Sequence, residues 1–368
     1  MSARVPFAPR FDHLVYVRVF EGCNLYCEHC FIPKNPKRMD HDAVVRVADY
    51  LRRFASPGQD ILIQWHGGEP TLFGPDWLEE AICRLEEAAR EFRLSHGIQT
   101  NLMTYSSRWA EVYRRHFGGV VGVSWDPGIR LLARGRPETN AAYEERFWRN
   151  LRRLVADGLD PYLVMTATRS FFETFHNPFA LFELLRSNGI RRAHIERLTE
   201  TGYARDNWQR LGVDNAAYAK GMARILRAYV AWRKVPDDGR DLNLSPFDGL
   251  IESVRTLGDT PAGYGCWSGA CDSRFHTVDA SGYKRGCTAL TSEVDNKAAG
   301  GRSLRFDQGF ENVRRNRRAV NCAACPYRTI CSSGCLALAM DDGSGECSGG
   351  RTLFDAARRV VELGGGLT

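Results

Sequence analysis

The residues with the clearest chemical potential are three cysteines near the N-terminus, in the stretch EGCNLYCEHCF. Cys23, Cys27 and Cys30 follow a C-x3-C-x2-C spacing, which is tight enough for a single metal centre. Structural metal sites built wholly from protein usually close with four ligands. A 4Fe-4S cluster takes one ligand per iron, so three thiolates leave one iron open to a substrate or cofactor. The alternative is a zinc site completed by His29 or His66.

The remaining cysteines indicate further metal or redox chemistry. The chain holds twelve cysteines, and tight cysteine spacings in a cytoplasmic protein favour such chemistry because disulfides are disfavoured there. Cys83 lies apart in an amphipathic helical pattern, and we interpret it as a buried packing residue. The eight cysteines after residue 265 suffice for two iron–sulfur clusters or two structural zinc ions. They are Cys266, Cys271, Cys287, Cys322, Cys325, Cys331, Cys335 and Cys347.

The elements that must position these residues follow a regular alternation. Short apolar runs alternate with amphipathic helical stretches, and Asp40 and Asp76 are placed to cap two of those helices. Six β-then-α units predict an α/β fold with a parallel sheet covered by helices. Without a glycine-rich dinucleotide fingerprint, we expect an open, partial (β/α)6 barrel. The candidate strands are 13–20, 61–67, 95–101, 120–126, 162–169 and 193–198.

Polar or glycine-rich segments follow four of these strands. GCNLYCEHC follows the first strand, GGEPTL the second and TN the third, while SWDP begins within the fourth. Parallel barrels collect their active sites at the carboxyl ends of the strands. We therefore expect these segments to converge on one mouth, with Gln99 and Asn101 as lining candidates.

The sequence predicts three regions. The barrel occupies residues 1–202, a helical bridge 203–262, and a cysteine-rich, turn-rich domain 263–368. The last region is predicted to contain a hairpin, RFHTVDASGYKRGC, turning at Ser281–Gly282.

Together these motifs resemble the radical S-adenosylmethionine (radical SAM) superfamily. The C-x3-C-x2-C loop after the first strand and GGEP after the second are similar to the motifs of that superfamily. The later cysteines resemble a SPASM domain, as found in peptide- and protein-modifying maturases such as anaerobic sulfatase maturases and ribosomal-peptide maturases. The resemblance covers essentially the whole chain.

The resemblance implies S-adenosylmethionine and three 4Fe-4S clusters as cofactors. Cys23, Cys27 and Cys30 hold the cluster whose open iron binds S-adenosylmethionine, and its cleavage gives a 5′-deoxyadenosyl radical that abstracts hydrogen from a substrate. Two auxiliary clusters then have interleaved ligands. By resemblance, Cys266, Cys271, Cys287 and Cys335 hold the first, and Cys322, Cys325, Cys331 and Cys347 the second.

The resemblance also implies contacts to S-adenosylmethionine. The GGEP motif binds the amino group, His29 stands where an aromatic residue stacks on adenine, and the fourth strand supplies an S-x-D pair. An arginine twelve residues after that serine matches a carboxylate-binding position, and a solvated loop charge is the alternative. The implied residues are Gly67, Gly68, Glu69, Pro70, His29, Ser124, Asp126 and Arg136.

The catalytic base is the point at which this chain departs from the sulfatase maturases. In those enzymes an aspartate follows the cysteine at the position of Cys287 and acts as the base, whereas Thr288 stands there in this chain. Asp272 and Glu196 are the candidates for a replacement, because each is expected near the mouth. The alternative is that both are ordinary polar residues.

Charge and composition limit the partners. The net charge is +6, and basic clusters such as RRNRR at 314–318 form either solvated helix faces or a docking surface for an acidic peptide or electron-transfer protein. No nucleic-acid module accompanies the charge, so we expect no nucleic-acid partner. With neither a signal peptide nor a membrane-length apolar run, we expect a cytoplasmic protein without a membrane partner.

By resemblance, the expected activity is cross-linking of a ribosomally synthesised peptide through a C–C, C–S or C–O bond. A flavodoxin- or ferredoxin-type protein would supply electrons. The first strand begins near residue 13, which leaves no room for an upstream leader-binding domain, so a separate leader-binding protein is one expected partner. The alternatives are a sulfatase-maturase-like side-chain oxidase, a small-molecule radical SAM enzyme, and a non-catalytic ferredoxin-type carrier.

Overall fold

A curved, largely parallel sheet forms the centre of the molecule. The computed structural model describes residues 11–32, 37–234, 241–257, 263–295 and 310–364. The described sheet has nine strands in the order β7-β6-β5-β4-β3-β2-β1-β8-β9, with parallel pairing from β7 through to β8. This confirms the predicted partial barrel. Its six predicted strands are β1 (His13–Phe20), β2 (Asp60–Gly67), β3 (Arg93–Thr100), β4 (Val120–Ser124), β5 (Asp160–Ala167) and β6 (Arg192–Arg197).

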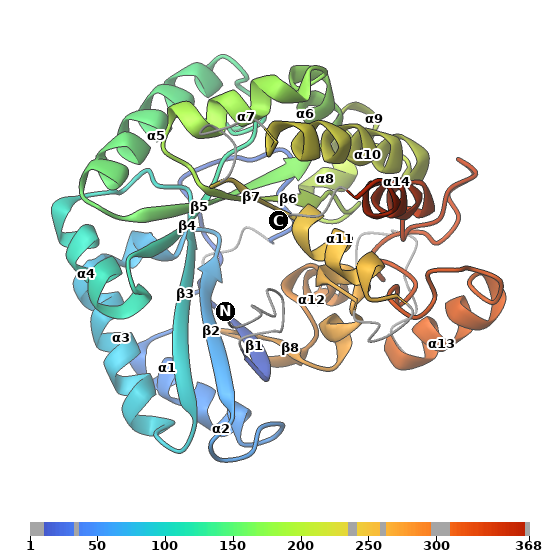
Figure 1. Ribbon diagram of the computed structural model, residues 1–368. Coiled ribbons are helices and arrows are strands. Elements are labelled where there is room, and N and C mark those ends of the chain that lie inside the picture. Colours follow the sequence, from blue (N-terminus) through green and yellow to red (C-terminus); the bar gives the residue numbers. More distant parts are fainter. Residues whose placement is uncertain (1–10, 33–36, 235–240, 258–262, 296–309, 365–368) are drawn as a thin grey trace.

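Helices cover the outer, convex side of this sheet (Figure 1). Along β5, Leu163 and Met165 are completely buried, whereas the alternating Tyr162 and Val164 are partly exposed. Because successive side chains of a strand point to opposite faces, the buried set packs under the helices and the other set faces inward. The covering helices are α1 (His41–Val45), α2 (Val47–Leu51), α3 (Pro75–Ala88), α4 (Ser107–Phe117), α5 (Thr139–Ala156), α6 (Arg169–Thr174) and α7 (Pro178–Ser187).

Three local predictions concern these helices, and the structure confirms one and contradicts two. Asp40 caps α1 as predicted, accepting a hydrogen bond from the Ala43 amide at 2.7 Å. Asp76, however, lies inside the first turn of α3, whose N-cap is Gly74, and its carboxylate pairs with an arginine of α4. Cys83, predicted to be buried, is exposed on α3 because the apolar stripe of that helix falls on other positions.

The segment after the barrel extends the same sheet. The predicted hairpin is confirmed as β8 (Phe275–Asp279) and β9 (Gly282–Arg285), and β8 also lies parallel to β1, a pairing that was not predicted. Arg18 of β1 and Asp279 of β8 form a buried ion pair at 2.6 Å. The predicted regional boundaries remain predictions. The other elements here are α8 (Tyr203–Asp206), α9 (Trp208–Leu211), α10 (Asn215–Trp232), β7 (Asn243–Ser245), α11 (Phe247–Arg255), α12 (Thr288–Asp295), α13 (Phe310–Val320) and α14 (Arg351–Glu362).

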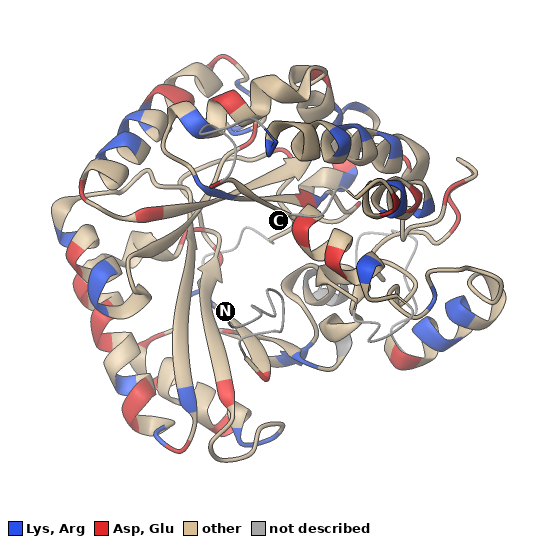
Figure 2. Cartoon of the chain, viewed as in Figure 1, with Lys and Arg blue, Asp and Glu red and all other residues tan. Residues whose placement is uncertain are grey.

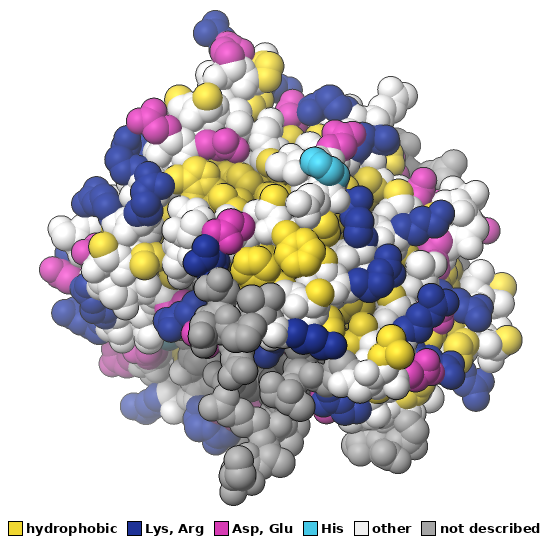
Figure 3. Space-filling model, turned by 45° about the horizontal axis from the view of Figure 1, so that its top comes forward, with side chains coloured by type: hydrophobic (Ala, Val, Ile, Leu, Met, Phe, Trp, Pro, Cys, Tyr) yellow, Lys and Arg dark blue, Asp and Glu magenta, His cyan; other side chains and the backbone are white. Residues whose placement is uncertain are grey.

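Charged residues are found mainly on the outer helices, and α13 carries a run of basic residues (Figure 2). Lysines and arginines are spread over much of the face seen in Figure 3, between patches of hydrophobic side chains. Within the described part of the chain, no helix is both long and apolar enough to cross a membrane.

Candidate active site

The three N-terminal cysteines lie on a loop that directly follows β1. Its backbone is held by the loop after β4: the Tyr26 amide donates to the Leu131 carbonyl at 2.8 Å, and the Glu28 amide to the Ile129 carbonyl at 3.1 Å. The carbonyl of Cys30 accepts a hydrogen bond, at 2.9 Å, from the first amide of α8. The cluster loop, defined here as residues 21–32, is thus fixed by segments from two other strand ends.

The thiols of this loop suit an iron–sulfur cluster. Cys23, Cys27 and Cys30 are all partly buried. Burial raises the pKa of the Cys23 thiol, and the charges of Cys27 and Glu69 add to the rise, so a thiolate here needs a bound cation. Among the described residues, no three Cys, His, Asp or Glu side chains converge tightly enough for a single ion. A 4Fe-4S cluster takes one ligand per iron, so the three thiols of this one loop would leave one iron open.

The GGEP motif is packed directly against the cluster loop. A Cβ on Gly67 would lie 2.1 Å from the Phe20 carbonyl oxygen, and one on Gly68 2.1 Å from that of Gly22. The amides of Gly68 and Glu69 donate to those same carbonyls at 2.7 and 3.0 Å. The close approach that requires glycine is therefore to the loop backbone. An approach to the amino group of S-adenosylmethionine stays a prediction.

Glu69 is buried and already has several protein partners. Its Oε1 accepts from the Thr71 amide at 3.0 Å, the Thr71 hydroxyl at 2.6 Å and the Thr100 hydroxyl at 2.8 Å; its Oε2 accepts from the Asn101 amide at 2.7 Å. Burial raises the pKa of this carboxyl despite these bonds. With a single donor in this set, Oε2 retains capacity for an ammonium group. Pro70 is also buried and begins a short 3-10 turn.

Asp126 connects the end of β4 to the cluster loop. Its Oδ2 accepts from Arg130 Nε at 2.8 Å and lies 3.2 Å from His29 Nε2, while Oδ1 accepts from the Thr166 amide at 2.5 Å. Arg130 also donates to Cys27 Sγ at 3.7 Å. Burial alone would raise the pKa of Asp126, but Arg130 and His29 hold it below its usual value. Asp126 therefore acts as an ionised anchor beneath the loop.

The structure places the other two predicted cofactor contacts from the end of β4 and the loop after it, Ser124 and Arg136, in different surroundings. Ser124 Oγ accepts from Gln99 Nε2 at 2.6 Å, so the ends of β3 and β4 meet. Arg136 is exposed and makes no side-chain hydrogen bond or ion pair with any residue the structure describes. Arg130, six residues earlier in the same loop, is the buried arginine, and sequence analysis missed it. The stacking of His29 on adenine remains a prediction.

Glu196 lies on the inward-facing side of β6 and heads a chain of hydrogen bonds. Its Oε2 is 3.1 Å from His194 Nε2, His194 Nδ1 is 2.8 Å from Ser245 Oγ, and Ser245 Oγ is 2.9 Å from the Tyr264 hydroxyl. The side chain of Glu196 is 49% exposed, so a substrate can reach it. The side chain of Asp272, the other candidate base, lies outside the described residues.

The first group of late cysteines lies within electrostatic range of Glu196. A hydrogen bond with Cys335 and burial raise the pKa of the Cys266 thiol, and the charge of Glu196 adds to the rise. Burial raises the pKa of the Cys287 thiol, and the charges of Cys271 and Cys335 contribute. The four cysteines assigned by resemblance to the first auxiliary cluster thus lie within electrostatic range of one another, and Glu196 of β6 lies within range of Cys266.

The cysteines assigned by resemblance to the second auxiliary cluster also influence one another's pKa values. Burial raises the pKa of the Cys322 thiol, with contributions from Cys325 and Cys347, and raises that of Cys331 to about 12, again with Cys347 nearby. A Cβ on Gly349 would lie 3.0 Å from Cys331 Sγ and 3.6 Å from Cys347 Sγ. Cysteines assigned to the same group therefore lie within electrostatic range of one another, and the interleaved assignment of cluster ligands remains a prediction.

Comparisons with known proteins agree with this architecture. Residues 17–169 match the family model described as the Radical SAM superfamily. The serine-type anaerobic sulfatase-maturating enzyme of Klebsiella aerogenes is 24% identical, covering 96% of this chain and 86% of that protein. The cysteine-type enzyme of Clostridium novyi (strain NT) is 23% identical, covering 85% of each chain.

Solved structures show the same fold. Native anSMEcpe with bound AdoMet and Cp18Cys peptide has a TM-score of 0.68 at 14% identity, covering 95% of this chain and 98% of that one. Streptococcus suis SuiB bound to precursor peptide SuiA has a TM-score of 0.55 at 15% identity, covering 89% and 72%. With its strand-end motifs and grouped cysteines, this chain carries a radical SAM domain over residues 17–169 and resembles the anaerobic sulfatase-maturating enzymes in sequence and SuiB in fold.

Proposed function

We propose that this enzyme removes hydrogen from a ribosomally synthesised peptide and closes a C–C, C–S or C–O cross-link within it. A peptide substrate is supported by anSMEcpe and SuiB, whose structures hold a Cp18Cys peptide and a precursor peptide. The observation that carries the proposal is the placement of carboxylates. Thr288, which follows Cys287, cannot serve as the aspartate base of a sulfatase maturase, whereas β6 presents Glu196.

The cofactors would be held by the residues already described. Cys23, Cys27 and Cys30 would bind the first cluster, with Oε2 of Glu69 facing the amino group of S-adenosylmethionine. When bound, these groups supply a 5′-deoxyadenosyl radical that takes a hydrogen atom, and the auxiliary clusters accept the electron that remains. Asp126 and its partners keep the cluster loop fixed against the barrel.

Glu196 would accept the proton that leaves the substrate. The protein around the half-exposed Glu196 side chain would alone raise its pKa, but hydrogen bonds from His194 and the Arg197 amide bring it below its usual value. The carboxylate is therefore ionised at neutral pH and ready to act as a base. His194, tied to Ser245 through its other nitrogen, orients the carboxylate.

The test begins by sequencing the neighbouring genes for a short precursor peptide, which is then incubated with the enzyme and analysed by mass spectrometry. Wild-type enzyme should remove two hydrogens per cross-link, and Glu196→Gln should slow this by about 100-fold or more while still forming 5′-deoxyadenosine. Exposed Glu200→Gln, from the loop after β6, is the matched control. Unchanged cross-linking by Glu196→Gln would exclude the assignment of Glu196 as the base.

A side-chain oxidase is the second candidate, favoured by the names of the Klebsiella and Clostridium relatives. It predicts an aldehyde in place of a serine or cysteine side chain of a sulfatase-derived peptide. Trapping with a hydrazide distinguishes the two products, because a cross-linked peptide carries no new carbonyl group. An aldehyde formed at a rate comparable with cross-linking would favour the oxidase.

A further inference from the structure

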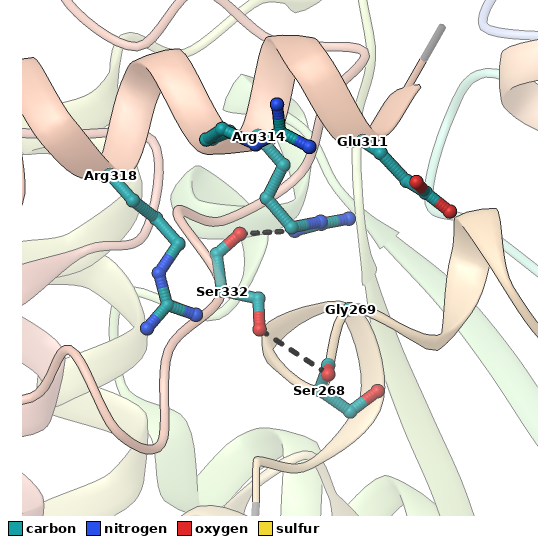
Figure 4. Close-up of a pocket in the computed structure, with 7 residues that line it drawn as sticks. Ser268, Gly269, Glu311, Arg314, Arg318 and Ser332 are labelled. Atoms are coloured by element: carbon teal, nitrogen blue, oxygen red, sulfur yellow. Dashed lines mark hydrogen bonds between the residues drawn. The ribbon is translucent and has the colours of Figure 1, made fainter.

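A basic pocket lies in the cysteine-rich region. It has a volume of about 360 Å³ and is formed where α13 faces two loops (Figure 4). Its lining residues are Ser268, Gly269, Glu311, Arg314, Arg315, Arg318 and Ser332. This set is called the α13 pocket below.

The α13 pocket has a strong positive charge. Three arginines line it and one carboxylate, Glu311, opposes them. Arg315 and Arg318 are exposed, and Glu311 is shared with Arg285 at 3.5 Å. Arginine stays protonated at any physiological pH, so this face attracts acidic surfaces under all working conditions.

The pocket lies between the loops that carry both groups of late cysteines. Arg314 Nη2 donates to Cys271 Sγ at 3.3 Å, and Arg314 also donates to the backbone carbonyl of Ser332. Ser332 directly follows Cys331, a member of the second group. A guanidinium on a ligand sulfur favours the reduced, more negative state of a cluster, because hydrogen bonds and charge tune cluster potentials.

We infer that the α13 pocket docks the acidic face of a small electron-transfer protein of the flavodoxin or ferredoxin class. This inference rests on the proposed auxiliary clusters. In the transfer, the reduced carrier loses one electron and an oxidised auxiliary 4Fe-4S cluster gains it, without a proton or a bond change. The electron would then pass to the cluster of Cys23, Cys27 and Cys30, which leaves the auxiliary cluster oxidised for the electron from the substrate. Charge complementarity brings the carrier to the pocket, and the Arg314–Cys271 contact gives the electron a short path inward.

The experiment compares three charge variants of the cluster-loaded enzyme, using a purified flavodoxin as the probe. Arg315→Glu/Arg318→Glu reverses the charge, and Arg315→Gln/Arg318→Gln removes it. Arg152→Glu, an exposed arginine of α5, is the matched control on the opposite side of the molecule (Figure 1). Calorimetry gives flavodoxin affinity at low and high salt, and stopped-flow absorbance gives cluster reduction by flavodoxin hydroquinone and by dithionite.

Wild-type affinity for flavodoxin should fall as salt rises, because screening weakens surface attraction. Charge reversal should weaken binding and slow flavodoxin-driven reduction by about 10-fold or more, and charge removal should do so by less. Dithionite reduction and iron content should match the wild type, and Arg152→Glu should change none of these quantities.

Three outcomes would overturn the inference. These are flavodoxin binding unaffected by both pocket variants, an equal loss in Arg152→Glu, and loss of binding of the precursor peptide in the pocket variants while flavodoxin binding persists. The charge-removed pair keeps the test valid if reversal disturbs folding. A wild-type enzyme with no dithionite-reducible signal beyond one cluster would instead contradict the proposed auxiliary clusters, so the two failures are distinguishable.

Discussion

Asp126 is completely buried. Its negative charge is balanced by the Arg130 guanidinium and the Thr166 amide rather than by solvent. Removing one member of a buried ion pair leaves the other charge without compensation, which costs more than losing an exposed pair. The same residue joins the end of β4 to Arg130 and, through it, to Cys27. A change at Asp126 should therefore affect both stability and the cluster loop.

We predict that Asp126→Asn destabilises the protein by about 3 kcal/mol, seen as a clear drop in the thermal unfolding midpoint. Asp60→Asn is the matched control, because Asp60 pairs with Arg93 on the exposed surface and should contribute little. Equal midpoints for the two variants would show that the buried pair does not support the fold.

The same carboxylate predicts a dependence of stability on pH. Arg130 and His29 hold the pKa of Asp126 below its usual value, against the effect of burial. A depressed folded-state pKa contributes stability above the unfolded value of about 4, and this contribution is lost as the pH falls through the folded pKa. Wild-type and Asp126→Asn midpoints, measured between pH 7 and pH 3, should therefore converge in acid.

Residue roles were the hardest features to predict from sequence. Arg136 matched a family position but is exposed, while Arg130 of the same loop is buried against Asp126. Spacing alone cannot tell which of two loop arginines turns inward, because that depends on where the loop after β4 meets the cluster loop. The prediction that Cys83 is buried was wrong for a related reason, because the sequence does not show which face of α3 turns toward the sheet.

At the scale of elements, the six barrel strands were predictable because each is an apolar run followed by a helical pattern. The pairing of β8 with β1 was not, because it joins segments far apart in the chain and leaves no periodic signal. The three-residue β7 was also too short to recognise. The GGEP motif follows β2 as predicted, and its packing against the cluster loop became clear only in the structure.

This packing makes Gly68→Ala a sharp test of how β2 supports the loop. The new methyl group would meet the carbonyls of Glu21 and Gly22 at 2.8 and 2.1 Å, so the loop backbone must move. We predict a loss of about one cluster per chain, measured by iron content and visible absorbance after anaerobic reconstitution. Gly74→Ala is the control: Gly74 has a φ of +90° but nothing within 4 Å of the added methyl group, and cluster content should remain normal.

At the scale of the whole molecule, two separate cysteine systems are joined by one sheet. The cluster loop follows β1, and β8, which pairs with β1, leads into the region that gathers the late cysteines. Glu196 on β6 lies within electrostatic range of the first late group, so the proposed base and the proposed electron acceptor face the same interior. The interleaved grouping came from the resemblance, and the sequence alone could not supply this geometry.

The most direct measurement is a paired assay of iron and 5′-deoxyadenosine on the wild type and on the triple variant Cys23→Ala/Cys27→Ala/Cys30→Ala. Wild-type enzyme, reconstituted anaerobically and reduced with dithionite, should hold about twelve irons and release 5′-deoxyadenosine from S-adenosylmethionine. The triple variant should keep about eight irons, in the auxiliary clusters, and release none. Continued release of 5′-deoxyadenosine by the triple variant, or about four irons in the wild type, would contradict the account.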